Sequence, residues 1–271
     1  MKIKELITEV EKLQIDPGFY CLSGKDAVRN TDYYGISRKL TYNLKYRKGE
    51  YRMTKEEYVQ KMNEDHEWAP GWDVIETEFS RLYPGQEPSH FGTAINSRAM
   101  FGGDEYLDGF SVYTNPEGYL HLVTFGMTEL YCDADAFGGE YSRWGYEMTM
   151  KLKEDSPENC MWAMNMLSNL ARYTYQSGKY YDPEECVPGN GTSLHIGTDS
   201  LITALITADD TTAKTQNSLH GKVGFIQYVG ITEQELNAIR ADISNIHKLI
   251  SLMKQDNPDL VTDMKRDFSY L

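Results

Sequence analysis

The sequence predicts an α+β fold in which a mixed or antiparallel β-sheet is covered by helices. Two stretches, 119–125 and 146–152, place apolar residues with the period of two that marks half-buried strands. Helical spacing and helix-start signals stand apart from them, in the segments 54–82, 156–177 and 232–254. The order is strand-rich segment, helix, strands, helix, which indicates the α+β class.

The first half of the chain is expected to supply two helices and most of the strands. Thr54 starts a helix, and Glu57 three positions later completes a capping box. That helix stops before Pro70, and a second helix covers Trp72 to Leu82. The strands are expected at 91–99, 107–114, 119–125 and 146–152, with a turn at 115–118.

The second half is expected to cover these strands. Ser156 caps a helix that has Pro157 at its first position and ends at Gly178. Thr232 and Glu235 form a second capping box. The remaining elements are strands at 201–207 and 223–229, a helix from 232 to 254 with a break near 242, and a short strand at 260–264.

The domain organisation is predicted as one domain, 53–271, preceded by an N-terminal extension, 1–52. The extension holds a small amphipathic helix at 3–13 and a segment rich in Tyr, Lys and Arg. We expect no transmembrane helix and no secretion signal, because no run of about 18 apolar residues occurs. The four cysteines are scattered without a CxxC pair, which is typical of reduced thiols and predicts the cytoplasm.

Negative charge is concentrated in the middle of the chain. Residues 61–210 carry 8 Lys and Arg against 25 Asp and Glu, a net charge of −17, whereas the whole chain carries −14. Such a field repels nucleic acid and attracts basic partners. A plainer interpretation is that the acidity only keeps the protein soluble.

The residue patterns predict no catalytic site, metal site or cofactor. The histidines show no metal-ligand spacing, and no nucleophile elbow or phosphate-binding glycine loop occurs. His121 lies inside a strand and is interpreted as a structural histidine. Cys132 is followed by Asp133 and Asp135, which would raise its pKa and not activate it. An enzyme is therefore not expected.

Carboxylate pairs are the remaining candidates for a site. They occur at 104/105/108, 133/135 and 209/210, without calcium-loop spacing. Two interpretations stay open: solvated loop acids, or an acidic surface that faces a partner.

Five stretches in order resemble the suppressor of fused family. They are HLVTFGMTELY (121–131), GYEMTMKLK (145–153), LARYTYQS (170–177), FIQYVGIT (225–232) followed by Glu235-Leu236, and VTDMKR (261–266). The resemblance covers roughly residues 68–267 and implies a single compact α+β domain without known catalytic residues. Animal members bind a zinc-finger transcription factor and have a second, C-terminal domain, which we expect this chain to lack. It is similar to the short bacterial members, which are linked with toxin systems as immunity proteins or antitoxins.

The resemblance and the acidity together predict a non-catalytic protein-binding module, most simply an immunity protein that neutralises a basic toxin encoded by a neighbouring gene. The alternative is a cytoplasmic adaptor or regulator that binds another protein, and an enzyme activity that the residue patterns do not reveal is a distant third. The predicted surface lies on the loops 101–108 and 131–144, where aromatic residues would anchor and carboxylates orient a partner. Its residues are Asp104, Glu105, Asp108, Tyr131, Asp133, Asp135, Glu140 and Tyr141. Trp144, just before a strand, is assigned to the core.

Overall fold

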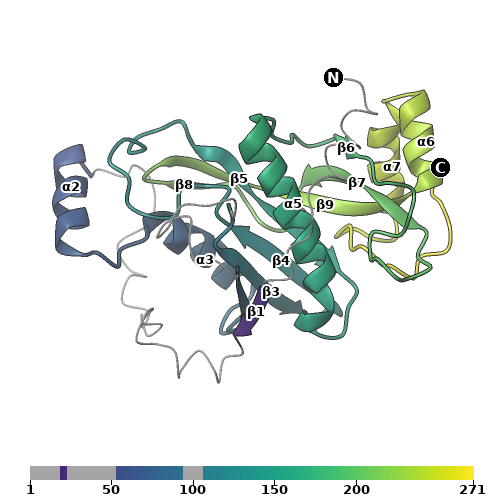
Figure 1. Cartoon of the computed structure of the whole chain (residues 1–271), viewed down its shortest axis with the longest axis horizontal. Coiled ribbons are helices and arrows are strands. Elements are labelled where there is room, and N and C mark those ends of the chain that lie inside the picture. Colours follow the sequence, from purple (N-terminus) through teal and green to yellow (C-terminus); the bar gives the residue numbers. More distant parts are fainter. Residues whose placement is uncertain (1–18, 23–52, 94–105) are drawn as a thin grey trace.

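The structure is a computed structural model of the chain that describes residues 53–93 and 106–271, and the backbone of 19–22 (Figure 1). The described strands are β1 (Phe19–Leu22), β2 (Ser89–Thr93), β3 (Gly109–Asn115), β4 (Tyr119–Phe125), β5 (Tyr141–Leu152), β6 (Cys186–Val187), β7 (Ile202–Asp209), β8 (Gln216–Ser218) and β9 (Gly221–Thr232). The described helices are α2 (Lys55–Glu64), α3 (Pro70–Leu82), the 3-10 turn η1 (Pro157–Cys160), α5 (Met161–Ser177), α6 (Glu233–Ala241) and α7 (Asn245–Met253).

The described strands form one mixed sheet, which confirms the predicted fold class. Its order is β1-β2-β3-β4-β5-β9-β7-β6, with β8 paired to β9. The central pair, β5 and β9, is parallel, and the other pairs are antiparallel. β1 lies within the predicted extension 1–52 and pairs with β2, so this part of the extension joins the sheet. The boundary at residue 53 stays a prediction.

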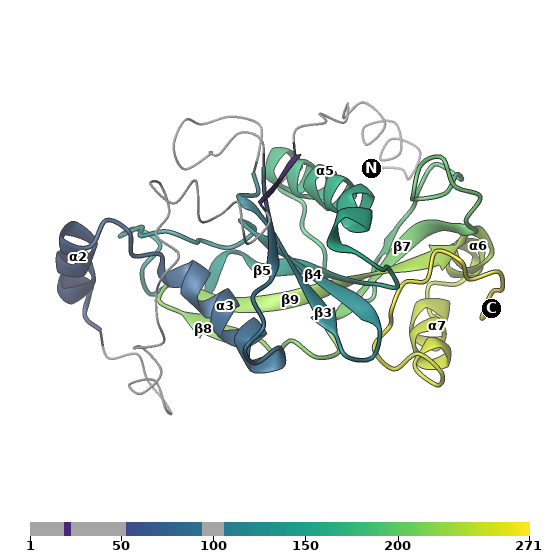
Figure 2. The same ribbon diagram turned by 90° about the horizontal axis from the view of Figure 1, so that it is seen from below.

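Helices cover both faces of the sheet (Figures 1 and 2). α5 packs on one face over an apolar cluster that includes Met148, Met150 and Tyr228. α3 packs on the other face over Phe225, while α6 and α7 cover Val229 on that same face. Successive residues of a strand point to opposite faces, so β9 contributes side chains to the cluster under α5, the cluster under α3 and the cluster under α6 and α7.

The predicted half-buried strand at 119–125 is therefore wrong in one respect. Its bounds are those of β4, but every residue of β4 is buried. The second predicted half-buried strand, 146–152, is wrong in the same respect, because all seven of these residues of β5 are buried. In β4, His121, Val123 and Phe125 lie on the side that α3 covers, where the His121 ring is 5.0 Å from that of Phe79.

The cap signals located the helices well. Thr54 and Thr232 each form the predicted capping box, and Gly178 ends α5 in the left-handed conformation. Ser156, in contrast, makes no side-chain cap, and the chain first forms the turn η1. The predicted strand at 260–264 is reduced to one bridge between Thr262 and Leu152.

Several strand ends differ from the prediction. β5 begins at Tyr141, five positions before the predicted start, and β2 begins at Ser89, two positions before the predicted start at 91. The part of the predicted strand 91–99 that follows Thr93 lies outside the described residues. β6 and β8 are too short to show a period in the sequence. The predicted helix at 3–13 lies outside the described residues. Among the described helices, none is long and apolar enough to cross a membrane.

Candidate protein-binding surface

The turn that leads from β4 toward the predicted binding loop is held by one buried carboxylate. Glu147 of β5 accepts hydrogen bonds from the hydroxyls of Thr124 and Thr128, at 2.6 and 2.7 Å. It also accepts from the backbone amides of residues 126, 127 and 128, at 2.9–3.2 Å. Burial raises the pKa of Glu147 to about 7, and these donors act against that rise. The carboxylate thus fixes where the loop leaves the sheet.

Tyr58 of α2 ties the loop 131–144 to the rest of the domain. Its hydroxyl accepts from the Asp133 amide at 2.7 Å and lies 2.8 Å from Nε2 of His220, to which it donates. Nδ1 of His220 then donates to the carbonyl of Glu129, 3.2 Å away. Because each group has a partner, this buried junction is satisfied.

Aromatic rings and close backbone contacts reinforce that junction. The ring of Tyr58 lies 4.8 Å from that of Phe137 and 5.2 Å from that of Trp68. The Gly138 amide donates to the carbonyl of Leu219 at 2.9 Å. A side chain at Gly139 would meet the His220 carbonyl at 2.8 Å, so this approach requires glycine. The loop is therefore packed in place along much of its length.

The tip of the loop is directed to solvent. Asp135, Glu140 and Tyr141 are exposed, and the Tyr141 side chain is 55% accessible. Lys222 lies 5.2 Å from the centre of the Tyr141 ring. Within the described residues, Asp135 and Glu140 form no ion pair, so their charges are free to attract a cationic partner. We call these three residues, together with Asp133, the acidic loop surface.

The remaining predicted site residues are placed differently. Asp104 and Glu105 lie outside the described residues. Asp108 and Tyr131 are partly buried, and the Tyr131 hydroxyl donates to the Asp108 carboxylate. This hydrogen bond ties the start of the loop, at Tyr131, to the residue that precedes β3. Trp144, assigned to the core, packs against the α5 cluster while staying partly exposed.

Tyr58, Glu129 and His220 position the loop but were not singled out in the sequence. Tyr58 and His220 are 162 positions apart, and no local pattern joins them. Glu129 forms an ion pair with Arg143, which also donates to the Tyr175 hydroxyl at 3.1 Å. Glu129 precedes the loop and Arg143 lies near its end. Their opposite charges are a sequence signal that could have predicted an ion pair between the two ends of the loop.

The pKa of the Cys132 thiol is raised, as the sequence predicted, though for a different main reason. Burial raises the pKa of its thiol first, and Asp65 and Asp73 add to the rise, whereas Asp133 and Asp135 are not among the causes. Its sulfur donates to the Trp68 carbonyl at 3.1 Å. The thiol therefore acts as a further anchor of the loop.

A second polar cluster has the residue types of a catalytic site but is sealed. Nε2 of His121 donates to Asp210 at 3.0 Å, and the Tyr83 hydroxyl lies 2.8 Å from Nδ1. Nζ of Lys151 lies 3.3 Å from the same carboxylate. The side chains of His121, Lys151 and Asp210 are all inaccessible to solvent. The cluster lies on the sheet face between the α3 core and the α6–α7 core. We call it the buried polar seam.

The seam confirms the structural interpretation of His121 and corrects that of Asp210. Burial alone would raise the pKa of Asp210, but His121 and Lys151 hold it well below its usual range. Asp210 also accepts from the amides of Thr212 and Ala213, both at 2.8 Å. Of the predicted pair at 209/210, only Asp209, the last residue of β7, is exposed to solvent.

The fold and the acidic loop surface define an α+β domain with a fixed, negatively charged loop at one end of its central strand. The sequence profile of the family described as Suppressor of fused protein (SUFU) matches residues 103–267, more than half of the chain. The chain therefore belongs to the SUFU family.

Relatives and solved structures agree with this assignment. The human and mouse proteins named Suppressor of fused homolog are each 31% identical to the chain over 217 residues, which span 72% of this chain and 43% of each relative. The chain thus spans less than half the length of these relatives.

Solved structures share the fold. The Suppressor of Fused protein of Drosophila is 25% identical, with a TM-score of 0.64 over 74% of this chain and 51% of its own. The Sufu–Fu complex gives the same score at 24% identity, over 74% and 93%. A putative SUFU homolog from Neisseria gonorrhoeae gives 0.50 at 12% identity, over 74% and 97%, a likeness of fold alone.

Proposed function

We propose that this chain is a non-catalytic protein-binding module and that the acidic loop surface contacts the partner. The observation that carries the proposal is the contrast within one loop. Its base is fixed by Tyr58 and Glu147, whereas Asp135, Glu140 and Tyr141 project into solvent. A preorganised surface loses little conformational entropy on binding, and an exposed tyrosine beside carboxylates is a common anchor.

The partner we propose is a basic toxin encoded by a neighbouring gene, which makes the chain a bacterial immunity protein or antitoxin in the cytoplasm. The net charge of −17 over residues 61–210 supports this choice. Opposite charges accelerate association and favour a cationic partner over others. In this proposal Asp104, Glu105 and Asp108 contribute from the neighbouring loop, and Asp108 orients Tyr131.

Co-expression tests the proposal in cells. The neighbouring gene product should arrest growth when expressed alone, and the chain should restore growth. The double variant Asp135→Lys, Glu140→Lys should fail to protect. A matched control, Glu87→Lys with Glu117→Lys, makes the same charge change at exposed positions beside the β3–β4 turn, away from the loop, and should still protect. A harmless neighbour, or full protection by the loop variant, would contradict the proposal.

An adaptor role is the second candidate. One Sufu protein has been solved as a Sufu–Fu complex, so at least one family member assembles with another protein. If this chain acts likewise, affinity purification from its host should recover a non-toxic partner through the wild-type protein. The loop variant should lose that partner while the control variant retains it.

A further inference from the structure

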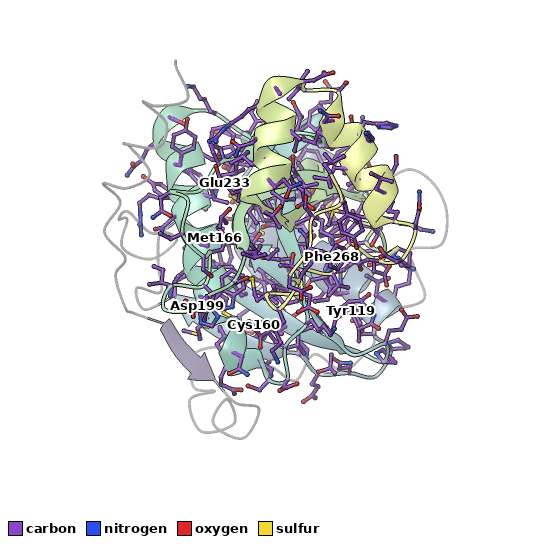
Figure 3. The ribbon with its side chains drawn as sticks, turned by 90° about the vertical axis from the view of Figure 1, so that its right-hand side faces the viewer. Tyr119, Cys160, Met166, Asp199, Glu233 and Phe268 are labelled. Atoms are coloured by element: carbon purple, nitrogen blue, oxygen red, sulfur yellow. The ribbon has the colours of Figure 1, made fainter. Side chains whose placement is uncertain are left out.

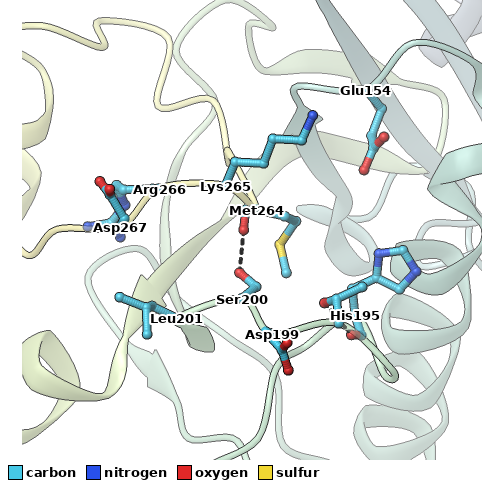
Figure 4. A pocket seen from close by; sticks show the side chains of 10 residues that line it. Glu154, His195, Asp199, Ser200, Leu201, Met264, Lys265, Arg266 and Asp267 are labelled. Atoms are coloured by element: carbon cyan, nitrogen blue, oxygen red, sulfur yellow. Dashed lines mark hydrogen bonds between the residues drawn. The ribbon is translucent and has the colours of Figure 1, made fainter.

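A groove of about 430 Å³ is shown in Figure 4. Its lining residue Glu154 follows the end of β5, whereas the acidic loop surface lies at the start of that strand. One wall is the segment 195–201 before β7, and the other is the segment 264–267 near the C-terminus. The lining residues are Glu154, His195, Thr198, Asp199, Ser200, Leu201, Met264, Lys265, Arg266 and Asp267. We call it the tail groove. Figure 3 views this end of the molecule, with Asp199 and Phe268 labelled.

Hydrogen bonds fix both walls of the tail groove. The Ser200 hydroxyl donates to the Met264 carbonyl at 2.5 Å and so joins one wall to the other. Arg266 donates to both carboxylate oxygens of Glu235, at 2.6 and 2.9 Å, which holds the second wall against α6. The groove is therefore a built feature with a defined shape.

Apolar side chains are held open to solvent along the first wall. Leu201 is 50% exposed, and Ile196 is 74% exposed. Ile196 lies in a turn closed by the Thr198 amide and the His195 carbonyl, and Gly197 supplies its positive φ of 86°. In Figure 4 the Met264 side chain lies in the middle of the lining residues. Leu201 and Met264 both line the groove and offer apolar surface to a ligand.

The charges around the groove are unbalanced. Arg266 is neutralised by Glu235. Burial raises the pKa of Glu154, and the charges of His195 and Lys265 act against that rise. Asp199 and Asp267 remain, and within the described part of the chain neither forms an ion pair. The groove therefore combines apolar lining residues with two exposed carboxylates that form no ion pair among the described residues, next to one exposed lysine, Lys265.

We infer that the tail groove binds an extended peptide that carries an apolar side chain next to an arginine or lysine. The apolar group would contact the apolar lining residues Leu201 and Met264, and the cation would pair with Asp199 or Asp267. This site is separate from the acidic loop surface. The two lie at opposite ends of β5, and a strand of that length spans roughly 35–40 Å. One chain could thus hold two protein segments at once.

A peptide array tests the inference directly. Hexapeptides with Gly-Ser flanks would carry every pairing of Leu, Ile, Met, Phe or Ser with Arg, Lys, Glu or Gln at the two central positions. The purified chain should bind the apolar–basic members and leave the apolar–acidic and Ser–basic members unbound. Binding of the best member should weaken about tenfold in Leu201→Ser and in Asp199→Asn, a change of roughly 1.4 kcal/mol.

Two controls make the result specific to the groove. Ile243→Ser removes a 65% exposed apolar side chain from the link between α6 and α7 and should leave peptide binding unchanged. The loop variant Asp135→Lys, Glu140→Lys should also retain it, which separates this inference from the proposed function. Absence of array binding, equal binding of acidic members, or binding unaffected by both groove substitutions would overturn the inference.

Discussion

The acidic loop surface and the buried polar seam contain the same kinds of residue, but in opposite environments and with different roles. In the seam, Asp210 is surrounded by Lys151, His121 and backbone amides, and water is excluded. On the loop surface, Asp135 and Glu140 face solvent. A carboxylate that is buried and fully paired specifies the fold, whereas one that is exposed on a fixed support is available to a partner.

The seam also explains why the sheet face toward α3, α6 and α7 has two apolar cores instead of one. Gln227 of β9 lies between Phe225 of the α3 core and Val229 of the α6–α7 core. Its amide donates to the carbonyls of Asp259 and Leu260, at 2.9 and 3.0 Å. The polar residues thus attach the segment after α7 to the middle of the sheet.

The largest effect is expected from breaking the seam. Lys151→Met removes the lysine that pairs with the buried carboxylate of Asp210, so the free energy of unfolding should fall by about 3–5 kcal/mol in urea titrations. Lys153→Met is the matched control, because that lysine is 65% exposed and pairs with Asp263 at the surface. It should cost less than about 1 kcal/mol. Equal losses in the two variants would show that the seam does not differ from a surface ion pair.

Glu147 should give the next largest effect, visible as a pH dependence. Burial raises its folded pKa to about 7 from 4.5, so the folded state holds the proton more tightly than the unfolded chain. This stabilisation is complete below about pH 4.5 and is lost as the pH rises through about 7. Relative to Glu147→Gln, the wild type should lose about 3 kcal/mol of unfolding free energy over this range. Parallel stability–pH curves would contradict this assignment.

A smaller effect is expected from Tyr58→Phe, which loosens the base of the loop without touching its exposed tip. The change removes the acceptor of the Asp133 amide and the donor to His220, at a cost of about 1–2 kcal/mol. Hydrogen exchange at residues 131–144 should accelerate. Tyr141→Phe, at an exposed position, should leave exchange unchanged. Similar exchange in both variants would show that Tyr58 does not hold the loop.

Local signals in the sequence predicted much of the fold. Both capping boxes and the bounds of β4 follow from short-range spacing. The burial of β4 on both faces could not be predicted, because α3 and α5 close over it from distant parts of the chain.

The candidate site was predicted only in its exposed part. Asp135, Glu140 and Tyr141 stand out in a short acidic and aromatic stretch. Their supports depend on contacts such as Tyr58 with His220, which form only when α2 meets the β8–β9 turn. In the sequence Asp210 does not differ from its exposed neighbour Asp209. Its burial depends on Lys151, which is 59 positions earlier in the chain.

The most direct test of the central claim is the affinity of the chain for the purified product of the neighbouring gene, measured by calorimetry at low and high salt. The account predicts tight binding that weakens with salt. It also predicts that Asp135→Lys, Glu140→Lys reduces both the affinity and its salt dependence, while Glu87→Lys, Glu117→Lys retains most of the affinity. Binding that is equal in the loop variant and the wild type at both salt concentrations would contradict the claim that the acidic loop surface meets the partner.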